Sequence, residues 1–430
     1  MKDRELHFIA IGGAGMSALA LVCDQLGARV SGSDRAESSY LRRLRDAGVN
    51  AVVGHDADQV PPKADVVVST AIGEDNPELA RARQRRQRVI HRGELLAELC
   101  SLKRVIAVSG THGKTTTAGM LVHALQSIGA EPAFFLGGEL PGAGGEAANA
   151  GWGAGEWVVA EADESDGSFL ELHPEIAVVT NVELDHHSRW SSREQLLEAF
   201  ERFAREAAGA GVLAESALDR LHGRERTLRF DLDSPGPPAL ELAVPGAHNV
   251  LNARAALAAL ELAGFELERG ANALRAFPGI KRRQELKGVH EASGAVIYDD
   301  YAHHPTEVTA TLAALRELEP RRLIAVFQPH LYSRTKALAT RFGAALAVAD
   351  EIGVLDVYPA REEPIGDLAG VSGLDVARTA ADHAGGRKVW WLGDAASAQR
   401  ALEPRLREGD LVVTIGAGDV FSLSDALVSH

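Results

Sequence analysis

Cysteine is scarce in this sequence of 430 residues, and its scarcity excludes two kinds of site. Only Cys23 and Cys100 are present. Two cysteines so far apart cannot build a disulfide framework or a cysteine-ligated metal site. We therefore expect a core held by apolar packing, with Cys23 as part of it.

The chain also lacks long apolar runs and an excess of positive charge. No stretch has membrane-spanning length, no signal-peptide core is visible, and Met1 to Glu5 are mostly charged. We expect a cytoplasmic protein without a membrane partner. A formal net charge of −15 argues against a general nucleic-acid binder, although it leaves room for a local cationic site that takes an anionic substrate.

What the sequence does contain is a repeated alternation of apolar strands and helical patterns. The apolar runs are rich in β-branched residues and are separated by helix-like segments, which predicts an α/β fold with parallel sheets. The runs read LHFIAIG, DVVVST, RVIAVSG, EWVVAEAD, EIAVVTN, LIAVF and DLVVTIG.

Two breaks interrupt this alternation and divide the chain. One lies near Cys100 to Lys103, where a helical pattern that starts at Arg92 gives way to a new strand, and the other lies near Phe277 to Arg283. We predict three domains, which comprise residues 1–100, 101–282 and 283–430. The first and third are expected to be Rossmann-like and the central one to resemble a P-loop ATPase.

A glycine loop between a strand and a helix predicts a phosphate site in the central domain. After RVIAVS come Gly110, Gly113, Lys114, Thr115 and Thr116, and then an apolar helical stretch. Backbone N–H groups and the helix N-terminus would hold phosphate oxygens, the lysine would neutralise charge, and Thr115 would hold Mg²⁺. The chain has only eight lysines, so a lysine at this position favours function over a ligand-free turn.

Acidic residues follow a neighbouring strand and predict a metal site. The stretch WVVAEADESD places Glu161, Asp163, Glu164 and Asp166 directly after a strand, and we expect Glu161 to bind Mg²⁺. A second strand, IAVVTN, ends in Asn181 and leads to Asp185 and His186, so an imidazole would reach the same sheet edge. The alternative is an acidic helix cap followed by solvated loop residues.

A second glycine loop lies near the N-terminus. FIAIGGAGMSALAL places Gly13, Gly15 and Ala18 in the positions of a dinucleotide fingerprint, and Asp34 follows at the end of a second strand. A tight turn without a ligand would use the same glycines. A functional loop would accept NAD, FAD or the diphosphate of a nucleotide sugar. Because the chain also contains a predicted ATP site, a ligase or kinase is favoured over a dehydrogenase.

Nine motifs, read together, resemble the Mur ligase family of peptidoglycan synthesis. They occur in the family's order over nearly the whole chain, and DDYAHHPTE with QPHLYSR is typical of the branch that adds alanine. The motifs are GGAGMS, GTHGKTTT, EADESD, NVELDHH, GAHNVLNARAA, FPGIKRRQE, DDYAHHPTE, QPHLYSR and TIGAGD.

The resemblance implies a role for each motif of the first two domains. The sugar nucleotide would contact Gly13, Gly15, Asp34, Ser69 and Thr70. Lys114 and Thr115 keep their phosphate and Mg²⁺ roles. The metal shell would be completed by Glu161 and His186, and the adenine of ATP would be bordered by His248, Asn249 and Asn252.

For the third domain, the resemblance implies contacts to ATP and to the amino acid, and closure over ATP. Arg283 would reach a phosphate and Asp300 the ribose of ATP. The incoming amino acid would face His303, His304, His330 and Arg334. Each histidine has an alternative as a hydrogen-bonded structural residue, but their clustering favours function.

The activity that the resemblance implies is the ATP- and Mg²⁺-dependent ligation of L-alanine to UDP-N-acetylmuramate through an acyl phosphate. Three alternatives remain: a related ligase that attaches a recycled murein peptide to the same sugar nucleotide, a dinucleotide-dependent oxidoreductase, and a nucleotide sensor without catalysis.

The sequence departs from the family in three places. Leu331 stands where many relatives have arginine, so the carboxylate of alanine would depend more heavily on Arg334. The stretch from Ala214 to Arg229 looks short. No lysine occurs between Lys114 and Lys281, so the carbamylated lysine that several sister ligases use must be absent or replaced.

Overall fold

The computed structural model describes residues 1–428 apart from 143–145, 185–189, 191, 215–226, 233–239 and 361. The chain packs as two compact units. The first comprises Met1–Leu242 and Val250–Phe277, and the second comprises Ala243–Asn249 and Pro278–His430.

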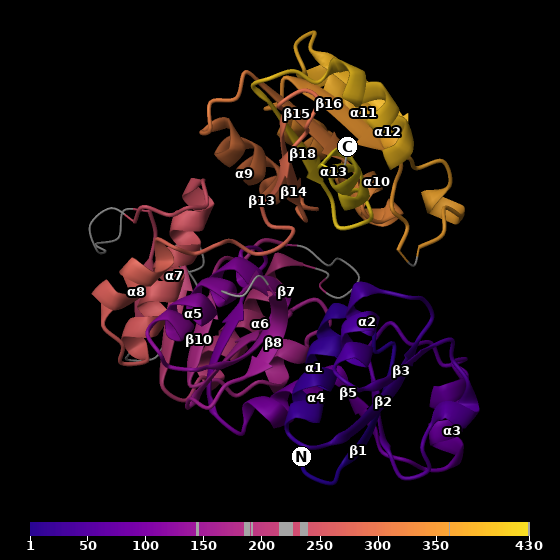
Figure 1. The fold of residues 1–430 in the computed structure, drawn as a ribbon, viewed down its shortest axis with the longest axis vertical. Coiled ribbons are helices and arrows are strands. Elements are labelled where there is room, and N and C mark those ends of the chain that lie inside the picture. The colour runs from indigo at the N-terminus through magenta and orange to yellow at the C-terminus, as the bar shows by residue number, and fades with distance from the viewer. Residues whose placement is uncertain are drawn as a thin grey trace. The chain divides into compact units, whose positions relative to one another are not determined.

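The first unit begins with a five-stranded parallel sheet in the order β3-β2-β1-β4-β5. Its strands are β1 (Glu5–Ile9), β2 (Arg29–Asp34), β3 (Asn50–Val53), β4 (Asp65–Val68) and β5 (Val89–His91). Helices connect the strands, as Figure 1 shows in indigo and violet. They are α1 (Ala14–Gln25), α2 (Ser39–Asp46), α3 (Pro77–Gln84) and α4 (Arg92–Cys100), with the short η1 (Ala57–Gln59).

A seven-stranded sheet completes the first unit, in the order β12-β11-β10-β6-β9-β7-β8, and only the β7–β8 pair is antiparallel. The strands are β6 (Arg104–Ser109), β7 (Ala133–Pro141), β8 (Ala147–Trp152), β9 (Trp157–Glu161), β10 (Ile176–Val179), β11 (Ala210–Ala214) and β12 (Thr227–Phe230). The helical segments are α5 (Lys114–Ser127), η2 (Ser168–Glu171), α6 (Arg193–Glu206), α7 (Ala247–Leu262) and α8 (Leu267–Leu274), of which α7 belongs to this unit from Val250 onward.

The second unit holds a six-stranded sheet in the order β13-β14-β18-β15-β16-β17, in which only β13 runs antiparallel to its neighbour. The strands are β13 (Glu285–Val289), β14 (Val296–Asp300), β15 (Arg322–Phe327), β16 (Glu351–Leu355), β17 (Lys388–Gly393) and β18 (Asp410–Ile415). The helical segments are α9 (Pro305–Arg316), α10 (Tyr332–Leu346), η4 (Gly366–Leu368), α11 (Gly373–His383), α12 (Ala395–Leu402), η5 (Glu403–Arg405) and α13 (Phe421–Val428).

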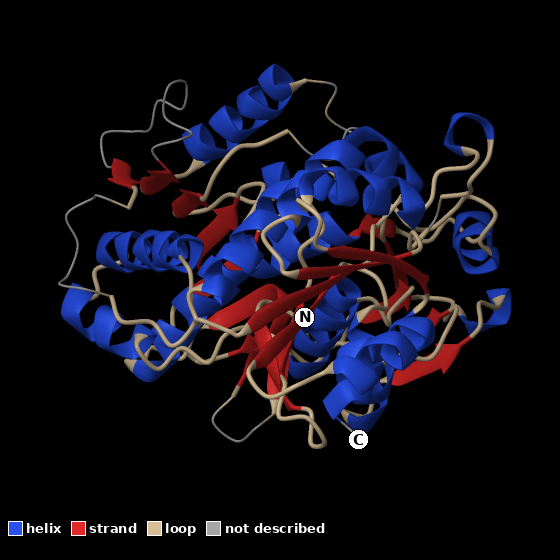
Figure 2. Cartoon of the chain, turned by 90° about the horizontal axis from the view of Figure 1, so that it is seen from above, coloured by secondary structure: helices blue, strands red, loops and turns tan. Residues whose placement is uncertain are grey.

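Burial explains why these segments form strands. Every residue of β10 and β18 is buried, as expected for central parallel strands covered by helices on both faces. Figure 2 shows the strands in red with blue helices against them. The predicted α/β fold class is therefore confirmed, and each of the seven apolar runs contains a strand. Among the described helices, none has both the length and the apolar character needed to cross a membrane.

Packing and sequence divide the chain differently. The break predicted near residue 100 separates α4 from β6, yet the sheets on either side of it belong to one unit. The short stretch Ala243–Asn249 packs with the second unit, although it lies far ahead of the predicted boundary at 282. The two boundaries therefore stay predictions about functional domains.

Candidate active site

The loop from Gly110 to Gly113 joins β6 to α5 and needs glycine at both ends. Gly110 has a φ of 130°, and an added Cβ would lie 2.1 Å from Oγ1 of Thr180. Gly113 has a φ of 79°, and an added Cβ would lie 2.4 Å from Oδ1 of Asn252. A side chain is thus excluded by backbone conformation and by space. The loop is the compact turn at a helix N-terminus that the sequence predicts.

Lys114, the first residue of α5, points back into this loop. Its Nζ donates hydrogen bonds to the carbonyl oxygens of Gly110 (2.6 Å) and Thr111 (3.1 Å) and lies 2.9 Å from a carboxylate oxygen of Glu164. Burial by itself lowers the pKa of Lys114, but Glu164 and the neighbouring carboxylates outweigh burial and raise the net pKa. The lysine therefore stays a cation inside the loop.

Glu161, at the end of β9, is held from two sides. Thr115 donates a hydrogen bond from Oγ1 to Oε1 of Glu161 (3.0 Å), and the backbone N–H of Gly137 donates to Oε2 (2.6 Å). A hydroxyl and a carboxylate next to each other form a hard-oxygen donor set of the kind that Mg²⁺ prefers. These two residues fit the predicted metal site, whereas its third residue, His186, and Asp185 lie outside the described residues.

The loop that follows Glu161 carries more acids, and their ionisation differs. Burial would raise the pKa of Asp163, but Lys114 and Arg92 outweigh it and lower the pKa to about 2. At Glu164, which is 1% exposed, burial prevails against Lys114 and raises the pKa to about 7. Asp163 is thus a stable anion, whereas ionisation of Glu164 depends on the neighbouring charge of Lys114.

The remaining polar groups of this sheet edge position the loop and α5. Asn181 accepts a hydrogen bond from the N–H of His112 at 2.9 Å and donates one to the carbonyl oxygen of the same residue at 2.8 Å. Asn252, on α7, accepts a hydrogen bond from Oγ1 of Thr117 at 3.3 Å. Thr116 is nearly buried in the first turn of α5. Asn181 thus holds the backbone of the predicted phosphate loop, and Asn252 holds the start of the helix that follows it.

The N-terminal glycine loop is closed by Asp34. Its Oδ2 accepts a hydrogen bond from the N–H of Gly12 at 2.9 Å, and Ser38 donates to the carbonyl oxygen of Gly12 at 3.1 Å. Gly13 is the N-cap residue of α1, which places Gly15 in the first turn. Asp34 therefore fixes the conformation of this loop, and its predicted contact to the sugar nucleotide stays a prediction.

Ser69 and Thr70 directly follow β4, which is the neighbour of β1 in the sheet. They therefore lie at the same sheet edge as the glycine loop, because carboxyl ends of parallel strands meet at one edge. Thr70 is exposed and Ser69 half-buried. The geometry places the five predicted sugar-nucleotide residues together at this edge.

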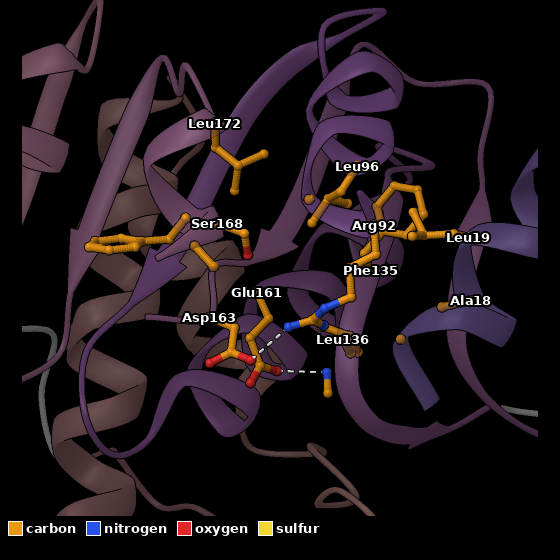
Figure 3. A pocket seen from close by; sticks show the side chains of 15 residues that line it. Ala18, Leu19, Arg92, Leu96, Phe135, Leu136, Glu161, Asp163, Ser168 and Leu172 are labelled. Carbon is orange, nitrogen blue, oxygen red and sulfur yellow. Dashed lines mark hydrogen bonds and ion pairs between the residues drawn. The ribbon is translucent and has the colours of Figure 1, made fainter. Parts of the chain in front are cut away.

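Arg92 joins the two sheets of the first unit. Its Nη2 donates to Asp163 at 3.2 Å and to Asp166 at 2.7 Å, and Figure 3 shows it reaching from α4 toward Asp163 beside Glu161. Around it lies a cavity of about 130 Å³ whose lining includes Gly15 and Glu161. Sequence reasoning missed this arginine, because nothing within its own helix marks it.

In the second unit, residues near the start of α7 pack against the segment before β13. Asn249 is 4% exposed and donates from Nδ2 to the carbonyl oxygen of Pro245 (2.7 Å) and to Oε1 of Gln284 (2.9 Å). Burial lowers the pKa of His248 to about 4, and the nearby Glu307 offsets this only in part. His248 is thus neutral at pH 7, as a residue bordering an uncharged base would be.

Asp300, the last residue of β14, is 4% exposed, and its carboxylate already accepts three hydrogen bonds. The donors are the N–H of Gln284 (3.0 Å), the N–H of Ala302 (2.7 Å) and the hydroxyl of Thr311 (3.0 Å). Burial raises its pKa to about 6, against the opposing effect of Arg283. In this conformation Asp300 organises the loop, and its predicted contact to a ribose stays a prediction.

Arg283 lies over the ring of Tyr301, with its guanidinium carbon 5.0 Å from the ring centroid. Its Nη1 is 3.9 Å from a carboxylate oxygen of Glu307, which is a long ion pair. The side chain is 28% exposed. Its weak attachment leaves the guanidinium able to turn toward an anion.

The four residues predicted to face the amino acid lie after β14 and after β15 of one sheet, with Arg334 in the first turn of α10. The rings of His303 and His330 are 6.2 Å apart, and His330 stacks on Tyr358 at 5.8 Å. Arg334, which is 9% exposed, lies with Nη1 3.4 Å from Nδ1 of His330. These three predicted residues form one cluster.

His304 is different from the other histidines. It is the N-cap residue of α9, where its Nδ1 accepts a hydrogen bond from the N–H of Thr306 at 3.4 Å, and it is 1% exposed. Glu307 completes this capping box and also accepts a hydrogen bond from the N–H of His303 at 3.0 Å. The sequence DDYAHHPTE contains both partners, but the capping role was not predicted.

Comparison with known proteins matches three parts of the chain to one family. Residues 5–104 match the model of the Mur ligase family catalytic domain, residues 108–219 the Mur ligase middle domain, and residues 282–418 the Mur ligase glutamate ligase domain. Curated relatives named UDP-N-acetylmuramate–L-alanine ligase include one from Streptomyces griseus, 43% identical over 99% of this chain and 96% of the relative, and one from Renibacterium salmoninarum, 44% identical over 98% and 95%.

Solved structures agree with these relatives. The UDP-N-acetylmuramate-alanine ligase of Thermotoga maritima has a TM-score of 0.84 and 29% identity, with 99% of this chain and 98% of that chain covered. A murein peptide ligase of Psychrobacter arcticus has a TM-score of 0.70 and 25% identity, with 99% of both chains covered.

Proposed function

This chain belongs to the Mur ligase family, and on that premise we propose that it ligates L-alanine to the muramoyl carboxylate of UDP-N-acetylmuramate with ATP and Mg²⁺. Identity of 43–44% to relatives named for this reaction supports alanine over a recycled peptide as the acceptor. The family match also leaves no support for an oxidoreductase. The observation that carries the proposal is the loop at Lys114, where a buried cation sits at a helix N-terminus.

The first step is a phosphoryl transfer. An oxygen of the muramoyl carboxylate attacks the γ-phosphorus of ATP, the bond to the β-phosphate oxygen breaks, and ADP leaves. Two like unit charges about 4 Å apart repel by roughly 4 kcal/mol at an effective dielectric of about 20. Lys114 offsets this repulsion, and it can exchange Glu164 for a phosphate oxygen without losing its charge.

Thr115 and Glu161 would hold Mg²⁺, since hydroxyl and carboxylate oxygens match its preference. When bound, the ion supplies charge neutralisation of the phosphates. Gly137 keeps the carboxylate of Glu161 oriented through its backbone N–H. Asn181 orders the loop itself through two hydrogen bonds to His112.

The second step is attack of the amine of alanine on the acyl phosphate, which releases inorganic phosphate and forms the amide. The ammonium must first lose a proton. We assign this acceptor role to His330 or His303, whose rings adjoin, because His304 is buried and caps α9. Arg334 would bind the carboxylate of alanine, since Leu331 supplies no charge.

The test is phosphate release in the presence of UDP-N-acetylmuramate, ATP and L-alanine, with each substrate omitted in turn. We expect release only when all three are present. Lys114→Met should lower the rate at least about 100-fold, the range found when one preorganised charge stabiliser is lost. The exposed Lys63→Met serves as the control and should leave the rate unchanged.

Two results would contradict the proposal. A murein tripeptide that is accepted far better than L-alanine would assign the chain to the peptide-attaching branch. Nucleotide binding without phosphate release under any combination of substrates would indicate a sensor.

A further inference from the structure

Arg92 connects elements that the proposed reaction uses separately. It is the first residue of α4, in the first sheet region, but its guanidinium binds the loop after β9 in the second. Nη2 carries both hydrogen bonds, to Asp163 and to Asp166, and Asp166 is 7% exposed. The arginine thus fixes the position of the acidic loop that also faces Lys114.

The other end of the guanidinium faces the glycine loop. A Cβ added to Gly15 would lie 3.3 Å from Nη1 of Arg92, so this nitrogen covers the first turn of α1. Among the described residues, no hydrogen-bond acceptor is assigned to Nη1. Nη1 is therefore a donor held beside the loop where the sugar nucleotide is expected.

The cavity beside Arg92 explains why a cation is needed there. It measures about 130 Å³ and reaches from Gly15 to Glu161, that is, from the predicted diphosphate loop to the predicted metal ligand. Within its described lining, two side chains are acidic, Glu161 and Asp163, and one is basic, Arg92. Figure 3 shows these three groups together, with apolar side chains around them. Arg92 offsets one of the two negative charges, so its loss would strengthen the repulsion of an anion.

We propose that Arg92 binds an anionic group of the sugar nucleotide through Nη1 while Nη2 holds the acidic loop in place. Arginine suits this double contact because its planar guanidinium presents several donors in fixed directions, whereas a lysine offers a single point charge. The inference rests on the proposed function, since it assigns a residue to the same sugar-nucleotide site. The group is either the diphosphate or the carboxylate of the muramoyl moiety, and both offer the same chemistry.

The experiment measures binding by calorimetry, without turnover. In Arg92→Gln the Kd for UDP-N-acetylmuramate should rise roughly tenfold to a hundredfold, as expected for the loss of a charge-assisted hydrogen bond. The Kd for a non-hydrolysable ATP analogue alone should stay within about twofold. Arg92→Lys should recover part of the affinity, because it restores the charge but not the second contact.

Arg88→Gln is the matched control. Arg88 lies four residues earlier, is 54% exposed and pairs with Glu94, so its replacement should change neither Kd. Binding of UDP-N-acetylglucosamine, which lacks the carboxylate, then identifies the anionic group. If Arg92→Gln lowers the affinity for both sugar nucleotides equally, the contact is to the diphosphate. If it lowers only the affinity for UDP-N-acetylmuramate, the contact is to the carboxylate.

Two outcomes would overturn the inference. Unchanged affinity for UDP-N-acetylmuramate in Arg92→Gln would show that Arg92 does not contact the sugar nucleotide. If the affinities for the sugar nucleotide and for the ATP analogue fell equally, Arg92 would have only a structural role. Failure of the proposed function looks different, because the unaltered protein would then release no phosphate with the three substrates.

Discussion

At the scale of single residues, Gly113 shows how space and backbone conformation act together. Gly113 and Gly129 have nearly the same φ, 79° and 80°, so alanine at either position costs about 1–2 kcal/mol of backbone strain. Only at Gly113 does the added Cβ meet another atom, Oδ1 of Asn252 at 2.4 Å, while around Gly129 nothing lies within 4 Å.

We therefore predict that Gly113→Ala lowers the affinity for ATP at least tenfold, whereas Gly129→Ala loses some stability and keeps its ATP affinity. Calorimetric titration with an ATP analogue and thermal unfolding of both variants would check this. Equal ATP affinities in the two variants would mean that Asn252 moves aside freely.

Some residues of the candidate site could be predicted from the sequence, and others could not, for physical reasons. Gly110, Gly113 and Lys114 form one short turn, so their spacing alone indicates how they act. Arg92 acts across two sheets, and only the tertiary structure brings its guanidinium to Asp163 and Asp166. The part of the metal site that involves His186 stays a prediction, since His186 lies outside the described residues.

At the scale of elements, the start of α7 makes stability depend on pH. Burial lowers the pKa of His248 from 6.5 to about 4, and the opposing effect of Glu307 is smaller. Between pH 6.5 and 4 the unfolded chain binds this proton while the folded chain does not. Stability therefore falls as the pH is lowered through this range.

We predict that His248→Gln makes the decline in stability between pH 6.5 and 4 less steep. Urea denaturation at several pH values, without nucleotide, measures the slope. His383→Gln replaces an exposed histidine of the same unit and should keep the slope of the unaltered protein. Identical slopes in all three proteins would show that His248 takes up its proton equally in the folded and unfolded states.

The parallel strands were predictable, but the antiparallel edges were not. β6, β9 and β10 read as apolar runs because they are buried on both faces. β8 has the sequence AANAGW, which is poor in β-branched residues, and it is a strand because it pairs with β7 at the sheet edge. Tertiary pairing overrides local propensity there.

At the scale of the whole molecule, two asparagines on α7 belong to different compact units. Asn249 bonds to Pro245 and Gln284 in the second unit, and Asn252 bonds to Thr117 in the first. The two residues lie three positions apart on one helix and both are buried, so each serves as a control for the other.

We predict that Asn249→Ala raises amide hydrogen exchange around residues 282–286, whereas Asn252→Ala raises it around residues 110–117. Losing a buried hydrogen bond costs about 1–2 kcal/mol, so local protection should fall roughly tenfold. Exchange followed by mass spectrometry resolves the two regions. The same pattern in both variants would contradict the division of the chain within α7.

The bonds that cross between the first two sheets limit how this protein can be recombined with its relatives. Arg92 holds Asp163 and Asp166, Asn149 of β8 donates to the carbonyl oxygen of Ala14 at 2.8 Å, and Arg43 pairs with Glu139. A chimera that replaces only the first hundred residues would bring new side chains opposite Asp163, Asp166 and Glu139, and each of these pairings would then depend on what the replacement carries at positions 92 and 43. A graft intended to change the sugar specificity must therefore carry the β7–β8 hairpin and the acidic loop with it.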